Sequence, residues 1–181
     1  MRFVIADIIS SMVPHDKLES EHLEFAKNWI ASGAEICRRD QIDEPKIHLV
    51  VYFLAVDPEL PKILLVDHKK ARMWLPPGGH VHVDEHPKAT VLREAKEELG
   101  IEAELIFEEP LFLSVTPVVD HRIFHTDVSL WYLIKANSQQ LLQYDVGEFD
   151  NIRWYYRHEI PFDNAEPHLQ RFLDKVFTYY L

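Results

Sequence analysis

Between Gly79 and Ile101 the chain reads GHVHVDEHPKATVLREAKEELGI, and this stretch decides its fold. Pro87 to Gly100 predicts a helix, because proline suits the first helical position and glycine suits the residue just past the end. Glu94, Glu97 and Glu98 stand at i, i+3 and i+4 on that helix, so their carboxylates share one face. Like-charge pairs at this spacing destabilise a helix by roughly 0.2 to 0.5 kcal/mol each, which predicts a cationic partner for the acidic face.

The predicted partner of the acidic face is a divalent cation. Clustered carboxylate oxygens bind hard ions, and Mg²⁺ suits a site that water and substrate phosphates complete. Nearby basic side chains, Arg93 and Lys96, are one alternative, and a solvated acidic face is another. The upstream Gly79 and Glu85 favour the metal, since a glycine lets the backbone approach an ion and a phosphate where a Cβ would obstruct them.

The stretch resembles the Nudix box, the signature of the Nudix (MutT-like) hydrolases. The fixed positions of that box are all matched, by Gly79, Glu85, Arg93, Glu94, Ala95, Glu97, Glu98, Gly100 and Ile101. The resemblance implies an α/β (α+β) fold, in which a mixed β-sheet lies between helices as an α/β/α sandwich. It also implies an enzyme, a Mg²⁺-dependent hydrolase that acts on the phosphoric anhydride bond of a diphosphate.

The resemblance also implies a ligand set. Glu94, Glu97 and Glu98 would hold Mg²⁺, or Mn²⁺ in its place, with a backbone carbonyl at Gly79 in the Gly78-Gly79 loop. Arg93 would organise the carboxylates, because it faces Glu97 one turn later and can reach the loop that carries Glu85.

The general base is less well defined. Some family members take it from the box and others from a later loop. The later candidates in this chain are Asp145, Glu148 and Asp150, and Glu148 is preferred among them.

The substrate depends on residues outside the box. A nucleoside diphosphate linked to another group, such as the nucleotide sugar ADP-ribose, is favoured by Pro117, because a proline near this spacing resembles a feature of ADP-ribose-cleaving relatives. The alternative is that Pro117 is an ordinary loop proline, which would carry no information about the substrate. A sanitising nucleoside triphosphate pyrophosphohydrolase is the nearest alternative. A non-hydrolysing nucleotide-binding protein is the third, although that class usually has a broken box.

Histidines lie within the box and after it. The alternation in His80-Val81-His82-Val83 predicts a short strand with both imidazoles on one face, where they meet solvent, hydrogen-bond partners, phosphate or a softer metal such as Mn²⁺. His121 and His125 are candidates for the loop or strand edge of the substrate cleft.

Hydrophobic periodicity predicts the remaining elements. Residues 1–45 form an N-terminal helical extension, with helices at 3–12 and 18–31. Residues 46–181 form the Nudix domain, with further strands at 47–56, 62–68, 104–107, 111–115, 127–134 and 152–156 and a closing helix at 165–179. The apolar face of the extension packs either on the domain's own sheet or on a second subunit in a homodimer.

The net charge and the apolar content of the chain limit the classes of partner and the compartment that we expect. The formal charge of -11 disfavours nucleic-acid polymers and anionic membranes, and it would repel a small-molecule nucleotide unless a cation reverses the local sign. No stretch approaches the roughly 18 apolar residues of a membrane span, and the first residues do not resemble a signal peptide, so a cytoplasmic protein is predicted. The single cysteine, Cys37, is expected to be a small buried hydrophobe.

Overall fold

The computed structural model describes residues 1–38, 45–120 and 123–180, and these build an eight-stranded mixed sheet with helices around it. The elements in chain order are α1 (Arg2–Ser11), α2 (Lys17–Ala31), β1 (Ile47–Asp57), β2 (Lys62–His68), β3 (Met73–Leu75), β4 (Gly78–His80), α3 (Pro87–Leu99), β5 (Glu104–Leu105), β6 (Phe112–Asp120), β7 (Ile123–Lys135), β8 (Phe149–Tyr156), two 3₁₀ turns (Arg157–Glu159 and Phe162–Asn164) and α4 (Leu169–Tyr179). The predicted α/β architecture with a mixed sheet is therefore present.

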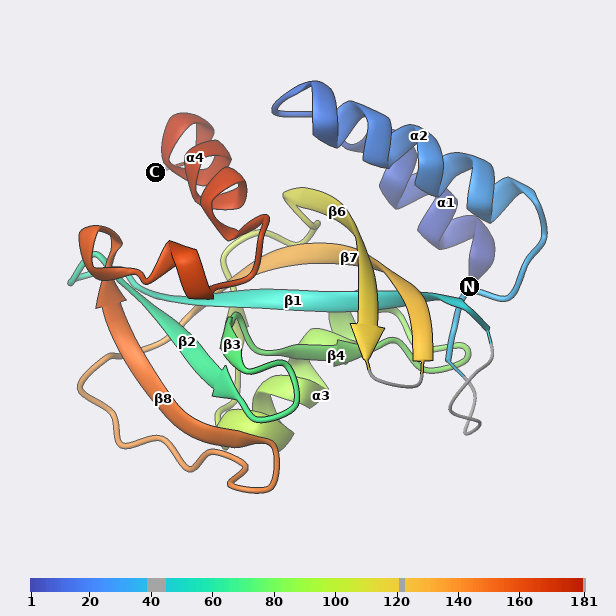
Figure 1. Cartoon of the computed structure of the whole chain (residues 1–181). Helices are drawn as coiled ribbons and strands as arrows, with labels where there is room; N and C mark the ends of the chain where they lie inside the picture. Colours follow the sequence, from blue (N-terminus) through green and yellow to red (C-terminus); the bar gives the residue numbers. More distant parts are fainter. Residues whose placement is uncertain (39–44, 121–122, 181) are drawn as a thin grey trace.

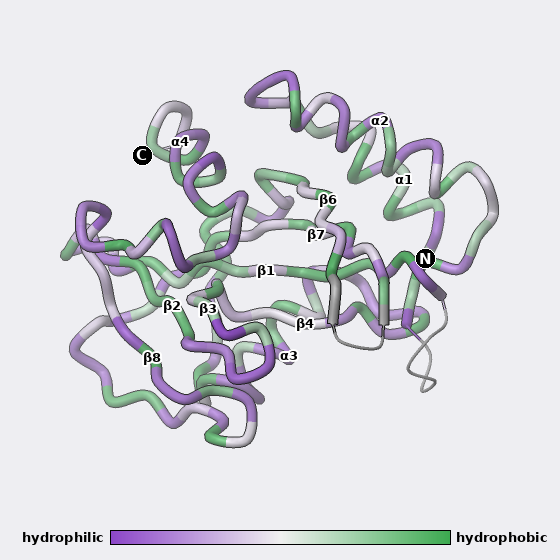
Figure 2. Tube along the Cα trace, in the orientation of Figure 1, coloured by the Kyte–Doolittle hydropathy of each residue, from purple (hydrophilic) through white to green (hydrophobic). Residues whose placement is uncertain are grey.

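The central strand β1 organises the sheet (Figure 1). It runs parallel to β7 and antiparallel to β2 and β4. Leu54 and Val56 pack in the hydrophobic cluster that contains α4, whereas Val51 and Phe53 pack in the cluster that contains α3. Because β1 is covered on both faces, its sequence is a nearly continuous apolar run, which Figure 2 shows as mostly hydrophobic colour.

The hairpin of β6 and β7 is longer than the sequence predicts. Strand β6 continues past the expected end at residue 115, and Pro117 lies within it, opposite Thr126 of β7. The expectation of an ordinary loop proline is therefore wrong. Among the described residues β6 pairs only with β7, and an edge strand tolerates a residue that has no N–H to donate.

The predicted strand at residues 80–83 is also wrong. Strand β4 ends at His80, and a turn follows in which Asp84 has a positive φ of 62°. The side chains of His80 and His82 consequently do not share an environment: His82 is exposed, whereas Nε2 of His80 is buried.

The N-terminal helices pack on the chain's own sheet. Helix α2 contacts β6, and its Glu19 carboxylate is fully buried there. Glu19 accepts hydrogen bonds from Nζ of Lys175 on α4, at 2.8 and 3.0 Å, and from the backbone N–H of Leu113 at 3.2 Å. Of the two packing options, the structure has the first, whereas the domain boundary at residue 45 and a homodimer remain predictions.

Two smaller expectations concern burial and membranes. Cys37 is buried, as expected, and its thiol donates to the carbonyl oxygen of His82 at 3.4 Å. In the described ranges, none of the helices combines the length and the apolar character that crossing a membrane requires.

Candidate active site

The acidic face of helix α3 lies against strand β4 of the sheet. His86 caps its start by accepting from the N–H of Lys88, Pro87 opens it, and Gly100 closes it with a left-handed φ of 68°. Its apolar side packs under β1, which turns Glu94 and Glu98 toward β4. Glu98 is only 6% exposed, and one of its carboxylate oxygens accepts from the N–H of Gly78 at 2.9 Å.

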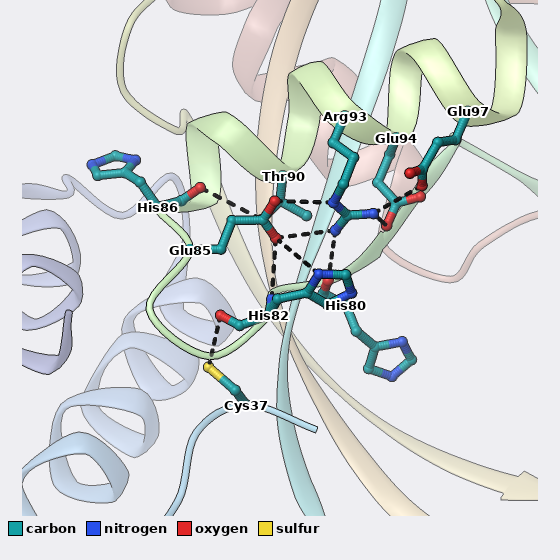
Figure 3. Close-up of polar contacts among 9 residues, drawn as sticks. All are labelled: Cys37, His80, His82, Glu85, His86, Thr90, Arg93, Glu94 and Glu97. Carbon is teal, nitrogen blue, oxygen red and sulfur yellow. Dashed lines mark hydrogen bonds and ion pairs between the residues drawn. The ribbon is translucent and has the colours of Figure 1, made fainter. Parts of the chain in front are cut away.

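Arg93 lies between the carboxylates, as Figure 3 shows. Its guanidinium donates to both oxygens of Glu85, at 2.9 and 3.0 Å. Its Nη1 donates to Glu94 at 2.8 Å and to Glu97 at 3.0 Å, and Nη2 donates to the carbonyl of His80 at 3.2 Å. These contacts fix the box loop against the helix, and they leave Arg93 no free edge for a substrate phosphate.

The carboxyl groups at the site have pKa values that are shifted in different directions. Burial, together with the charge of Glu94, raises the pKa of Glu98 well above its usual range, and burial also raises the pKa of Glu94 despite its bond to Arg93. For Glu85, burial acts in the same direction, but hydrogen bonds from Arg93, the backbone of His82 and Thr90 bring the pKa down to about 2. The buried carboxylate of Glu98 thus has no cationic partner among the described residues, and the negative charge of the partly buried Glu94, which shares Arg93 with Glu85 and Glu97, opposes its ionisation.

These residues fit a divalent cation. The donor set consists of oxygens, which hard cations prefer, and a cation beside Glu94 and Glu98 would relieve their repulsion. Glu97 is 58% exposed and occupies the rim, bonded to Arg93. Glu94 and Glu98 are therefore the central candidates for ligands, with Glu97 outside them.

The two glycines of the loop are packed differently. A Cβ on Gly78 would lie 2.0 Å from the backbone oxygen of Val51, because β4 pairs with β1 at this point. A Cβ on Gly79 would instead lie 2.0 Å from a carboxylate oxygen of Glu94. The first glycine permits strand pairing, and the second leaves room for the Glu94 carboxylate beside the backbone.

A pocket of about 830 Å³ opens beside this acidic face. Five of the residues predicted for the site line this pocket: Gly78, Gly79, Glu94, Glu98 and Glu148. Glu85, Arg93 and Glu97 lie outside the lining.

The three candidates for the general base differ in whether they line the pocket. Glu148 is in the turn before β8 and lines the pocket, and its charge raises the pKa of Glu94 and Glu98. Asp145 and Asp150 do not line it; the N–H of Asp145 donates to the carbonyl of Glu98, and Asp150 lies 3.9 Å from Lys69. Glu148 is thus the candidate with access to a bound substrate.

Several residues of the pocket were not predicted from the sequence. Glu166, which precedes α4, is 4% exposed with Oε1 unpartnered, and burial raises its pKa to about 8. His48, Tyr52 and Asp127 lie on strands that look like ordinary core in sequence, although a histidine and an aspartate in apolar runs were detectable signals. His125 lines the pocket as proposed, whereas His121 lies outside the described residues.

Comparison with known proteins identifies the family. Residues 46–176 match the model of the NUDIX domain, which is more than half of the chain. The chain therefore belongs to the Nudix family and is a hydrolase of pyrophosphate bonds, as the box implied. Members of this family typically use a divalent metal. A search of curated proteins found no significant match.

Solved structures agree with this assignment. A MutT NUDIX hydrolase from Burkholderia pseudomallei is 25% identical, with a TM-score of 0.57, over 72% of this chain and 98% of that one. A NUDIX-family hydrolase from Clostridium perfringens is 24% identical, with a TM-score of 0.55, over 72% and 96%. The NUDIX domain of Shewanella oneidensis NrtR, solved in complex with ADP ribose, is 20% identical, with a TM-score of 0.57, over 80% and 94%. The likeness to the last two supports the fold.

Proposed function

We propose that this hydrolase cleaves the diphosphate of a nucleoside diphosphate linked to a second group, with a nucleotide sugar such as ADP-ribose as the type substrate. The observation that carries the proposal is the scarcity of basic side chains in the pocket. Of its described lining, only Arg38 and Lys70 are lysine or arginine. A triphosphate carries more negative charge and would require more cationic partners.

The basic residues near the box support the same conclusion. Lys69 donates to the carbonyl oxygen of Val146 at 2.5 Å and does not line the pocket. Arg72 is exposed outside the pocket, and Arg93 is bonded to carboxylates. Pro117 and Tyr52 line the pocket and give a nucleoside or sugar an apolar surface. The Shewanella domain with bound ADP ribose provides independent support for this ligand class.

Each residue of the site has a separate role in the proposed reaction. Glu94 and Glu98 would hold Mg²⁺, which supplies charge neutralisation at the phosphates and a lower pKa for bound water. Arg93 positions Glu94 and Glu97 through its hydrogen bonds. Glu148 would accept the proton of the attacking water, because it is the exposed carboxylate of the pocket that Arg93 does not hold.

Product analysis tests the substrate. With Mg²⁺, ADP-ribose should give AMP and ribose 5-phosphate at a kcat/KM at least tenfold above that of any nucleoside triphosphate. Pyrophosphate release from a triphosphate at a higher kcat/KM would refute the choice of substrate.

A pair of variants tests the base. Glu148→Gln should lower kcat by about 100-fold or more, within the range of general-base contributions. Asp150→Asn, two residues on and outside the pocket, is the matched control and should retain activity. Equal activities of the two variants would exclude Glu148 from this role.

A further inference from the structure

A second group of polar side chains lies on the strands of the pocket and takes no part in the box. His48 of β1 is directly paired with Asp127 of β7, and His125 lies two residues before Asp127. Because side chains two residues apart on a strand point to the same face, these three side chains converge. The rings of His48 and His125 are stacked at 5.0 Å, and the ring of His80 lies 5.2 Å from that of His48.

This face of the sheet holds a concentration of buried polar atoms without partners. They are His48 Nδ1, His80 Nε2, Thr116 Oγ1, His125 Nδ1, Asp127 Oδ1 and Ser129 Oγ, and all six residues line the pocket. His48 is 3% exposed, so solvent contact does not satisfy its ring. Unpaired buried polar atoms destabilise a fold, so a group of them in one pocket points to a ligand that would satisfy them.

The distances favour an ion over hydrogen bonds within the group. Oδ1 of Asp127 lies 3.7 Å from Nδ1 of His48 and 3.5 Å from Nε2 of His125, which is too long for well-formed hydrogen bonds. Two ligands of one tetrahedral ion, each at about 2.1 Å from it, lie about 3.4 Å apart. One ligand atom from each of the three residues lies within 4.8 Å of the others.

The chemistry of the side chains agrees with the distances. His48 and His125 offer imidazole nitrogens and Asp127 offers a carboxylate oxygen, which are donor atoms that divalent metal ions bind in proteins. The ring of His48 donates to the backbone carbonyl of Pro45, while its Nδ1 has no hydrogen-bond partner and lies 3.7 Å from Oδ1 of Asp127. Metal-binding histidines are often oriented by a backbone carbonyl in this way. Arg38 lines the same pocket and opposes a cation, but the carboxylate of Asp127 in direct contact with an ion outweighs a more distant charge.

We propose that His48, His125 and Asp127 form a second metal site, which binds a borderline divalent ion such as Zn²⁺. Two imidazoles and one carboxylate are a ligand set of zinc sites that keep a fourth position open, whereas Mg²⁺ prefers oxygens. The open position faces the pocket, where water or an oxygen of a bound molecule completes the coordination. The site does not depend on the substrate proposed above or on the carboxylates of α3.

Binding of Co²⁺, a spectroscopic substitute for Zn²⁺, tests the proposal on the full chain after removal of metals with EDTA. Four-coordinate Co²⁺ with imidazole ligands absorbs visible light strongly, whereas Co²⁺ in a six-coordinate oxygen site absorbs weakly. The wild type should bind one Co²⁺ with strong absorption, and one equivalent of Zn²⁺ should abolish that absorption. His125→Ala should weaken Co²⁺ binding at least about tenfold, since changes even to outer partners of a metal site have effects of that size.

Three further variants decide the origin of the signal. Asp127→Asn keeps the shape of the side chain and should also lose the absorption, which guards against a folding defect in His125→Ala. His158→Ala removes an exposed histidine outside the pocket lining and should behave as wild type. Glu98→Gln should keep the absorption. The proposal is overturned if the wild type shows no such absorption, if His125→Ala and Asp127→Asn retain it, or if Glu98→Gln loses it.

Discussion

The Gly79→Ala substitution separates the geometry of the site from the stability of the fold. The added Cβ would lie 2.0 Å from a carboxylate oxygen of Glu94, and ordinary contact begins at 3.4 Å, so the carboxylate must retreat by about 1.4 Å. A misplacement of about 1 Å at a catalytic site can lower the rate about 100-fold. We therefore expect kcat/KM to fall about 100-fold at subsaturating Mg²⁺. The unfolding free energy should change by less than about 1 kcal/mol, since only the end of a flexible side chain has to move.

Gly78→Ala is the matched control, because its Cβ would meet the backbone oxygen of Val51 at the same 2.0 Å. Backbone in a paired strand cannot move aside easily, so this variant should lose about 1 to 3 kcal/mol of unfolding free energy. Urea unfolding followed by fluorescence gives the stabilities, and initial rates with ADP-ribose give the activities. If Gly79→Ala folds normally and keeps wild-type activity, the Glu94 carboxylate does not need its present position.

Three other perturbations have defined outcomes. Glu98→Gln should retain the fold and lower the rate at least 100-fold at subsaturating Mg²⁺, because it removes a ligand charge; near wild-type rates at all Mg²⁺ concentrations would contradict this. Glu166→Gln should be more stable than wild type above pH 8, with the difference vanishing near pH 5. The reason is that burial raises the pKa of Glu166 from an ordinary 4.5 to about 8, so stability is lost as the pH rises through that range; a Tm difference independent of pH would refute it. Lys175→Met should lower the unfolding free energy by about 3 to 5 kcal/mol, because it leaves the buried Glu19 carboxylate unpaired, and Glu19→Leu added to it should restore part of the loss in denaturant titrations.

The box helix could be predicted closely from the sequence because its determinants are local. Pro87 and Gly100 set its ends, and the spacing of the glutamates sets its acidic face. The contact of Arg93 with Glu85 also followed, since it needs only a helix and the adjacent loop. The place of Glu148 in the site depends on where the turn before β8 lies relative to the box. Its proximity to the box could be predicted only from the family resemblance.

The polar cluster on the strands could not be predicted in the same way. His48 and Asp127 are distant in sequence, and they meet because β1 and β7 pair in one parallel register. A histidine in an apolar run gives no indication of its cross-strand partner. The strand error at His80 has a similar origin: alternation favoured continuation of the strand, whereas the turn at Asp84 ends it.

The proposed chemistry requires that the carboxylates of Glu94 and Glu98 on α3 hold the divalent cation at which the diphosphate is cleaved. A crystal structure of the chain soaked in Mn²⁺, an oxygen-binding substitute for Mg²⁺, locates the ion through its anomalous scattering. We expect a peak in contact with carboxylate oxygens of both Glu94 and Glu98 beside the Gly78-Gly79 loop. Peaks confined to other parts of the molecule, with these two carboxylates free of metal, would contradict it.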